Sequence, residues 1–332
     1  MAIMRCNKCA LLQEQPDTLA GQSINCPRCA TNVSVYPTLF FIERMLGKYF
    51  SAHKELIHLR GTTGVENITS VATSPISPPQ LADIDLSNTD QLATEVQHGP
   101  IYDWFNKKHI KIQTNVSGVD TSGFFDEVAE AIGANLPILE DTLERIRWSQ
   151  QKEHASTTIH LDKESPKDAK TISTFCQRLY DFSFVAKCFH NTQEKNVRLI
   201  LQSAPAIRAF FNGEWLEWHA LMSSLRHAKE RSKRFSCARG LKIALHNSDS
   251  YELDVFMLID GQVPLCIECK SGEFRQNIDR YLTLKKRIGI PDKHFVMCIA
   301  GLNSDNAKAF SAMYNLAFVN ERSLSEHLSS LF

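Results

Sequence analysis

Apolar residues are spaced most regularly in the carboxy-terminal third of the chain. Three apolar runs of strand length, residues 240–246, 251–259 and 263–269, follow one another closely. Asp260-Gly261 separates the last two runs and is a strong hairpin signal. A helix is predicted before these strands, and a helix, a strand, a second helix and a short strand after them: residues 210–228, 274–287, 295–300, 305–313 and 317–319.

The pattern is less regular upstream. Residues 36–59 have apolar positions three and four apart, which is typical of an amphipathic helix. Residues 60–90 lose this periodicity and are rich in Gly, Ser, Thr and Pro, which predicts a flexible linker. Residues 91–203 predict a mainly helical connector that ends in a helix and a two-stranded hairpin. That ending is compatible with a winged helix. A structural or regulatory connector is favoured, because recognition of DNA by the wing would depend on only three basic residues.

Composition narrows the class of protein. The 332 residues are 43% hydrophobic and 22% charged with no net charge, as in an ordinary soluble protein of two or three domains. No apolar run is long enough to cross a membrane, and the amino terminus lacks the apolar core of a secretory signal. Ten cysteines without such a signal favour a reducing, cytoplasmic location and metal ligation over disulfides.

Two Cys-x-x-Cys pairs, sixteen residues apart, lie near the amino terminus: Cys6 and Cys9, then Cys26 and Cys29. Four thiolates complete the tetrahedral shell of a structural Zn²⁺ and leave no open position for catalysis. Residues 1–35 therefore predict a zinc ribbon, a module too short to hold its core without the metal. It resembles the ribbons at the start of many otherwise unrelated bacterial proteins. Such a ribbon binds nucleic acid, binds protein or only folds the terminus, and these three roles stay open.

Candidate catalytic chemistry lies in two neighbouring strands, as Asp254 in one and Glu268-x-Lys270 in the next. Residues two apart in a strand share a face, so Glu268 and Lys270 project together. A carboxylate pair binds a hard divalent cation, and a nearby ammonium polarises water or balances phosphate charge. An unpartnered Asp254 would be costly to bury, which favours a cation or a lysine beside it. The alternative for Glu268 and Lys270 is a plain ion pair.

These residues and the order of elements around them resemble the PD-(D/E)xK nuclease superfamily. Within it, the nuclease domain of CRISPR-associated CARF effector nucleases is the most similar. That domain carries a Gly-x-Trp-Leu-Glu helix, an Asp-Val strand and a Glu-Cys-Lys strand, matched here at residues 213–217, 253–255 and 268–270. The resemblance covers about residues 204–320, and it implies an α/β, restriction-endonuclease-like core for residues 204–332.

The resemblance also implies roles for individual residues. Asp254 and Glu268 would be the main ligands of Mg²⁺ or Mn²⁺, and Glu217 would be the acid of the helix near the metal. The backbone carbonyl of Cys269 would complete the shell. Lys270 would be the catalytic lysine that orients or deprotonates the attacking water.

Two features depart from the family pattern. No Rossmann-like CARF domain is predicted in residues 36–203, so activation by a cyclic oligonucleotide is not implied. The Gln-x-x-x-Tyr motif of RecB-type nucleases is absent, because Gln276 lies five residues before Tyr281. Tyr281 and its neighbour Arg280 are still predicted to contact phosphate or base, with an exposed helix face as the alternative.

A basic segment follows the predicted helix of Glu217. It is expected to flank the active site and to follow a phosphate backbone, with a solvated helix end as the equal alternative. The residues predicted to bind nucleic acid there are Arg231, Lys233 and Arg234.

The sequence thus predicts a divalent-metal-dependent nuclease that hydrolyses phosphodiester bonds, with DNA favoured over RNA. The resemblance adds a setting in prokaryotic defence against foreign nucleic acid. One alternative is a non-catalytic adaptor that binds nucleic acid or protein through its zinc ribbon. Another is a recombination or repair nuclease such as a junction resolvase. A homodimer and an activating protein or small ligand also stay open, whereas a membrane partner is not expected. The predicted domains are residues 1–35, 36–59, 60–90, 91–203 and 204–332.

Overall fold

A computed structural model describes most of the chain, which divides into two compact units, residues 1–76 and 77–332. The predicted helix over 36–59, beyond residue 38, and the predicted linker over 60–90 lie outside the described residues. None of the described helices combines the length and hydropathy needed to cross a bilayer. The described residues are 2–6, 11–38, 92, 94–119, 123–245 and 250–332.

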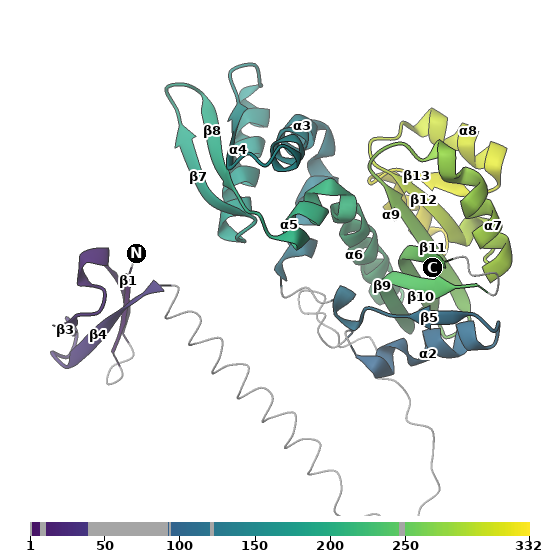
Figure 1. The fold of residues 1–332 in the computed structure, drawn as a ribbon, viewed down its shortest axis with the longest axis horizontal. Coiled ribbons are helices and arrows are strands. Elements are labelled where there is room, and N and C mark those ends of the chain that lie inside the picture. Colours follow the sequence, from purple (N-terminus) through teal and green to yellow (C-terminus); the bar gives the residue numbers. More distant parts are fainter. Residues whose placement is uncertain (1, 7–10, 39–91, 93, 120–122, 246–249) are drawn as a thin grey trace, which may run out of the picture. The chain divides into compact units, whose positions relative to one another are not determined.

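The amino-terminal unit is a four-stranded sheet in the order β2-β1-β4-β3 (Figure 1). Its buried side chains are few, and two of them, Cys6 and Cys26, are cysteines. The Cys6 N–H donates to the carbonyl of Leu11 and the Cys26 N–H to that of Thr31, both at 2.8 Å. The strands are β1 (Ala2–Arg5), β2 (Leu12–Gln15), β3 (Ser23–Asn25) and β4 (Asn32–Pro37).

The larger unit is built on a six-stranded sheet in the order β13-β12-β11-β10-β9-β5. The strands β9, β10 and β11 run antiparallel, and the turn between the last two contains Asp260 and Gly261, both with positive φ. The strands β12 and β13 continue the sheet in parallel with β11. Their bounds are β5 (Lys111–Gln113), β9 (Phe235–Ala244), β10 (Ser250–Ile259), β11 (Val263–Lys270), β12 (Phe295–Ile299) and β13 (Ala317–Val319).

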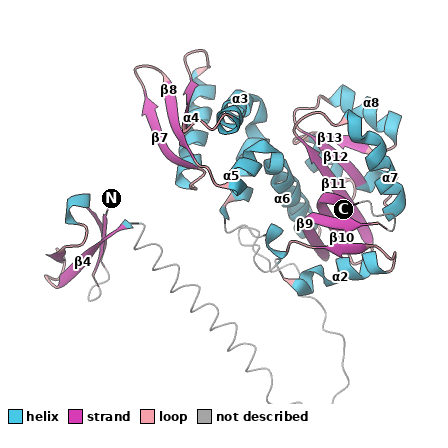
Figure 2. Cartoon of the chain, in the orientation of Figure 1, coloured by secondary structure: helices cyan, strands magenta, loops and turns pink. Residues whose placement is uncertain are grey.

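Helices cover both faces of this sheet, because its central strands are apolar on both sides (Figure 2). One face packs on α2 (Glu95–Asn106), α7 (Ile278–Ile288) and α8 (Ser304–Tyr314). The other packs on α6 (Trp215–Glu230) and α9 (Ser323–Ser329). The α/β fold class is confirmed, and the helices and strands predicted after residue 204 are present in the predicted order.

A second, three-stranded sheet in the order β6-β8-β7 lies upstream and shares a continuous core with α6. The helix and the two-stranded hairpin predicted at the end of the connector, residues 91–203, are both present. The longest helix of the predicted connector is interrupted at Asn135, two residues before Pro137. The elements are α3 (Phe125–Gln151), β6 (Ser156–His160), α4 (Pro166–Asp181), β7 (Val185–Asn191), β8 (Asn196–Leu201) and α5 (Pro205–Ala209).

The boundary predicted at residue 204 does not separate the two sheets. β5, expected in the connector, pairs with β9 through Lys111 and Ala244. The side chain of Gln97, in α2, donates to the carbonyl of Phe235 at 2.8 Å. Such contacts join residues more than a hundred positions apart, so local periodicity carries no signal for them. The stretch 95–113 therefore completes the six-stranded sheet.

Candidate active site

The predicted acidic and basic residues meet where two central strands part. The ladder between β10 and β11 ends at the pair Val255 and Ile267, so Asp254 and Glu268 are the next residue on each strand. The backbone N–H of Cys269 donates to Asp254 Oδ2 at 2.7 Å. This bond fixes the Asp254 carboxylate across the gap between the strands. We call the place where Asp254, Glu268 and Lys270 meet the strand fork.

Lys270 lies between the two carboxylates. Its Nζ is 2.9 Å from Asp254 Oδ2 and 3.6 Å from Glu268 Oε2. Burial by itself lowers the pKa of Lys270, but the charges of Asp254 and Glu268 outweigh it and leave the pKa raised. Lys270 is therefore protonated at neutral pH in this arrangement. The structure thus brings all three residues together, while their catalytic role stays a prediction.

Glu268 is the most buried group of the strand fork, with 2% of its surface exposed. Among the described residues, no group donates a hydrogen bond to its Oε1. Burial raises the pKa of Glu268 well above its ordinary value, and the negative charge of Asp254 raises it further, while Lys270 opposes both. A buried carboxylate oxygen without a donor is costly, because neither water nor protein replaces its lost hydration. A bound cation would remove that cost.

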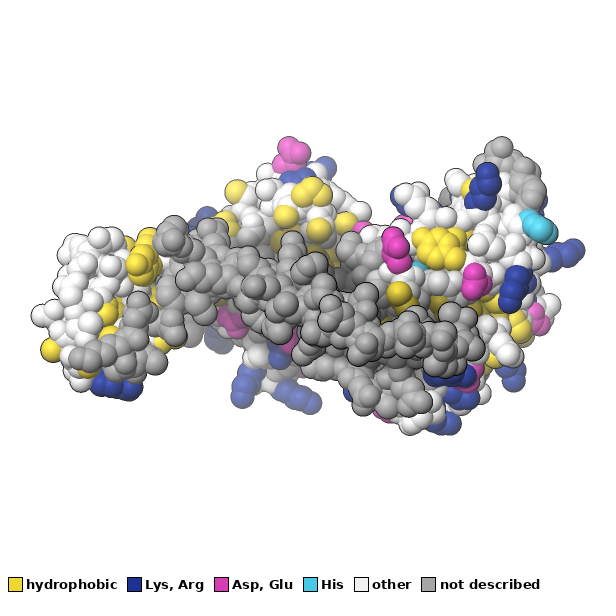
Figure 3. All heavy atoms as spheres, turned by 90° about the horizontal axis from the view of Figure 1, so that it is seen from below, with side chains coloured by type: hydrophobic (Ala, Val, Ile, Leu, Met, Phe, Trp, Pro, Cys, Tyr) yellow, Lys and Arg dark blue, Asp and Glu magenta, His cyan; other side chains and the backbone are white. Residues whose placement is uncertain are grey.

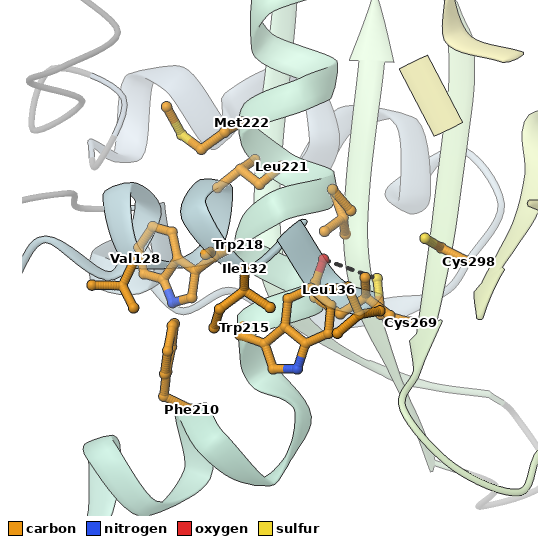
Figure 4. Close-up of a cluster of buried hydrophobic side chains, with 14 of the residues drawn as sticks. Val128, Ile132, Leu136, Phe210, Trp215, Trp218, Leu221, Met222, Cys269 and Cys298 are labelled. Atoms are coloured by element: carbon orange, nitrogen blue, oxygen red, sulfur yellow. Dashed lines mark hydrogen bonds between the residues drawn. The ribbon is translucent and has the colours of Figure 1, made fainter. Parts of the chain in front are cut away.

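The helix α6 carries the third acid, Glu217, toward the strand fork. The Cys269 thiol donates to the carbonyl of Leu216 at 3.6 Å, which ties β11 to the first turn of α6 (Figure 4). Trp215 and Trp218 anchor the same turn in the core between α3 and the sheet. Just before it, Gly213 has φ +141°, and a Cβ there would lie 2.9 Å from Ser271 Oγ. Only glycine permits this approach without a shift.

Glu217 is held by an arginine that the sequence prediction did not include. Arg239 Nη1 lies 3.0 Å from Glu217 Oε2, and the Arg239 guanidinium stacks on Trp218, 4.4 Å from the ring centre. Its Nε donates to the carbonyl of Gly118 at 2.7 Å. Burial, and next the charge of Asp254, raise the pKa of Glu217 to about 8 against the opposing charge of Arg239.

Arg239 was missed because the strand was predicted to begin at residue 240, whereas β9 begins at Phe235. An arginine within the mainly apolar stretch from Phe235 to Gly240 was the available signal. The structure therefore adds a positioning residue to the predicted set.

Of the remaining predicted contacts, only Tyr281 lies at the strand fork. The Lys270 Nζ is 5.7 Å from the centre of the Tyr281 ring. Arg280 instead donates to the carbonyl of Ser250 at 2.8 Å, and its guanidinium lies 4.7 Å from the centre of the Tyr251 ring. It therefore holds the start of β10.

The basic segment is not brought to the strand fork. Lys233 Nζ bonds to Asp260 Oδ2 at 3.1 Å, at the hairpin end of β10. Asp260 is six residues from Asp254, which corresponds to roughly 20 Å along a strand. Arg231 and Arg234 lie on either side of Lys233 and share this distant position. A spacing in sequence could not show at which end of the strand the segment would lie.

The amino-terminal unit holds a second candidate metal site. The sulfur atoms of Cys6, Cys26 and Cys29 all lie within 4.8 Å of one another, and the Cys6 and Cys29 sulfurs are 3.4 Å apart. Cys9, predicted as the fourth ligand, lies outside the described residues. Thiolates at this spacing suit Zn²⁺. A three-cysteine cluster is present, and the zinc site with four cysteine ligands stays a prediction.

We expect the Cys26→Ser variant to lose its zinc and to expose residues 1–38 to protease, because the small core around Cys26 would be held by the metal. Zinc content by atomic emission and limited proteolysis would measure both. Asp254→Ala is the matched control and should keep its zinc. Equal zinc content in Cys26→Ser and the wild type would contradict the site.

We also expect the protein, in buffer without Mg²⁺ or Mn²⁺, to lose stability as pH rises. The folded pKa of Glu217 is about 8 and its ordinary value is 4.5, so between these values the folded state binds the proton more tightly. Raising pH through this window lowers the free energy of unfolding by up to about 1.4 kcal/mol per unit. Urea unfolding from pH 5 to pH 8 should show a shallower fall in Glu217→Gln, and parallel curves would refute the prediction.

Of three comparisons with known proteins, only the one with solved structures finds similar chains. No family model matches it, and no curated protein matches it. Among solved structures it is similar to Can2 from Sulfobacillus thermosulfidooxidans in complex with cyclic tetra-adenylate, with 17% identity, a TM-score of 0.48, and 69% of this chain and 59% of that chain covered. It is also similar to protein VC1899 from Vibrio cholerae, with 15% identity, a TM-score of 0.47, and coverage of 70% and 60%. The chain thus spans about three fifths of each. Likeness at this level assigns neither a family nor an activity.

Proposed function

We propose that this protein hydrolyses phosphodiester bonds in nucleic acid, with DNA favoured as the substrate, and that Mg²⁺ or Mn²⁺ at the strand fork supports the reaction. The observation that carries the proposal is the convergence of Asp254, Glu268 and Lys270 at one point. A scaffold would gain nothing from a buried Glu268 whose Oε1 receives no hydrogen bond from the described residues.

The residues fit a hard divalent cation. Asp254, Glu268 and Glu217 offer carboxylate oxygens, the ligands that Mg²⁺ and Mn²⁺ prefer. Glu214 Oε2 lies 3.6 Å from Arg239 Nη1 and adds a fourth acid. Lys270 and Arg239 then carry two positive charges against four negative ones, so a divalent cation would balance the site when all four acids are ionised. The carbonyl of Cys269 is proposed as a further ligand. When bound, the ion would stabilise negative charge on the phosphate and lower the pKa of a bound water.

The other side chains of the site would each have a separate role in the reaction. Lys270 is held by Asp254 and stays charged, so it suits donating hydrogen bonds to the phosphate or to the attacking water. In the metal-free arrangement it is a poor proton acceptor, which favours the orienting role over the basic one. Arg239 opposes protonation of Glu217 and so lowers the cost of ionising this acid when it acts as a ligand. Tyr281 borders the same space.

Cleavage of single-stranded DNA, plasmid DNA and RNA, with Mg²⁺ or Mn²⁺ and with chelator, tests the proposal. We expect cutting that needs the metal, that is lost in Asp254→Ala and that survives in Glu252→Ala. Glu252 is exposed on the same strand and is the matched control. Cutting that persists in Asp254→Ala would overturn the proposal. Failure of the folded wild type on all three polymers would instead favour the adaptor. A setting in prokaryotic defence remains a proposal that rests on the sequence resemblance, and an activating ligand or partner is an open alternative that the resemblance does not imply.

A further inference from the structure

The three-stranded sheet β6-β8-β7 has one face in the core and one face open. Alternate residues of its strands, such as Ile159, Val197 and Leu199, are buried. Their neighbours in sequence project from the opposite side. We call this side the open sheet face; its residues are Ser156, Thr158, His160, Lys187, Phe189, Asn191, Asn196, Arg198 and Ile200.

An aromatic ring lies exposed on this open sheet face. Phe189 is 51% exposed, which is unusual for a phenylalanine in a strand. In the strand register it stands opposite Arg198, which in turn stands opposite Thr158, so the three form one row across the sheet. The surface is hollowed here, with a volume of about 990 Å³. The row therefore places a ring, a guanidinium and a hydroxyl at the floor of a shallow groove.

The open sheet face carries net positive charge, because Lys187 and Arg198 are its Lys and Arg residues, both are exposed, and no acid lies on it. Among the residues that line the hollow, Arg198 and Glu194 are the one Arg and the one acid, and Lys187 lies on the same sheet face outside that lining. The Glu194 carboxylate accepts a hydrogen bond from the Asn196 amide at 2.9 Å. On the face drawn in Figure 3, Lys, Arg, Asp and Glu side chains all lie at the surface of the described residues. An anion would find both charge and hydrogen-bond donors in the groove.

We propose that the open sheet face binds single-stranded nucleic acid, with one base stacked on Phe189 and the backbone phosphates beside Arg198 and Lys187. The proposal rests on the proposed nuclease function and names a second contact surface for its substrate. An exposed ring on a polar sheet offers an unpaired base a stacking partner, and stacking tolerates any base. A duplex hides its base faces and would leave Phe189 unused. A protein partner would need more apolar surface than Phe189 and the half-buried Ile200 offer.

Binding without cleavage tests the proposal. Fluorescence anisotropy would measure the affinity of the protein for labelled oligo-dT and oligo-U strands of twelve nucleotides, in buffer without divalent cations. We expect Phe189→Ala to bind about ten-fold more weakly, the loss that removal of one stacked base produces. Phe189→Trp should bind at least as well as the wild type, and Arg198→Ala should bind more weakly with a shallower salt dependence. Tyr180→Ala, an exposed aromatic of α4, is the matched control and should bind normally.

Two results would overturn the proposal: wild-type affinity in Phe189→Ala with its fold intact, or a duplex that competes as well as a single strand. The proposed nuclease function can fail separately. If Phe189 governs binding but no metal supports cutting, binding by the open sheet face is supported and the nuclease function is refuted. If cutting occurs while Phe189→Ala leaves affinity unchanged, the nuclease function is supported and binding by the open sheet face is refuted. Asp254→Ala should lose cutting and keep binding.

Discussion

Replacing Lys270 with alanine is expected to lower the rate of metal-dependent cleavage by about 10²- to 10³-fold. The Lys270 ammonium is fixed 2.9 Å from Asp254 and keeps its charge, so it is already oriented when negative charge develops on the phosphate. A charge that needs no reorganisation during the reaction is among the largest contributions a side chain makes to catalysis. Single-turnover cleavage at saturating metal would measure the loss.

The same substitution also removes a partner from two buried carboxylates. Breaking a buried ion pair costs about 3–5 kcal/mol, and the cost here should lie at the low end because 27% of the Lys270 side chain is exposed. Rates must therefore be compared well below the unfolding temperature of Lys270→Ala. Lys242→Ala is the matched control, since Lys242 is an exposed lysine of β9. A rate for folded Lys270→Ala within about three-fold of the control would contradict the assigned role.

Glu268→Gln is expected to stabilise the protein in the absence of divalent metal and to abolish the response to it. The Glu268 carboxylate is buried, its pKa is raised, and its charge is costly at neutral pH. Glutamine has nearly the same shape without the charge, so we expect a gain of about 1–3 kcal/mol in the free energy of unfolding. Lys270 would retain its contact with Asp254.

Thermal unfolding with and without Mn²⁺ measures both effects in one experiment. The wild type should gain stability from Mn²⁺, whereas Glu268→Gln should start higher and gain little, because a bound ion stabilises only the state that holds it. Glu252→Gln, on the exposed part of β10, should follow the wild type. A less stable Glu268→Gln that still responds fully to Mn²⁺ would show that Glu268 is a structural residue and not a ligand.

Local patterns predicted the strand fork well. Asp254, Glu268 and Lys270 lie in a hairpin marked by apolar runs and Asp-Gly, and hairpin register follows from nearby residues. Glu217 required only the helix that precedes the hairpin. The three residues of the strand fork are adjacent in the structure because short-range geometry makes them so.

The parts of the fold and of the site that the sequence did not predict depend on contacts between residues far apart in the sequence. Arg239 reaches the carbonyl of Gly118 across more than a hundred residues, and β5 is an edge strand of three residues. Neither produces a periodic signal. The basic segment shows a different limit, because a run of charges does not reveal which end of a strand it will occupy. Its bond from Lys233 to Asp260 serves the hairpin turn instead.

Anomalous diffraction from crystals soaked in Mn²⁺ tests the central claim most directly, since it locates the ion without reference to activity. We predict a Mn²⁺ peak within coordination distance of Asp254 and Glu268, and its absence in matched crystals of Glu268→Gln. Wild-type crystals that show no peak at the strand fork at saturating Mn²⁺, while the dissolved protein cleaves nucleic acid with Mn²⁺, would contradict it.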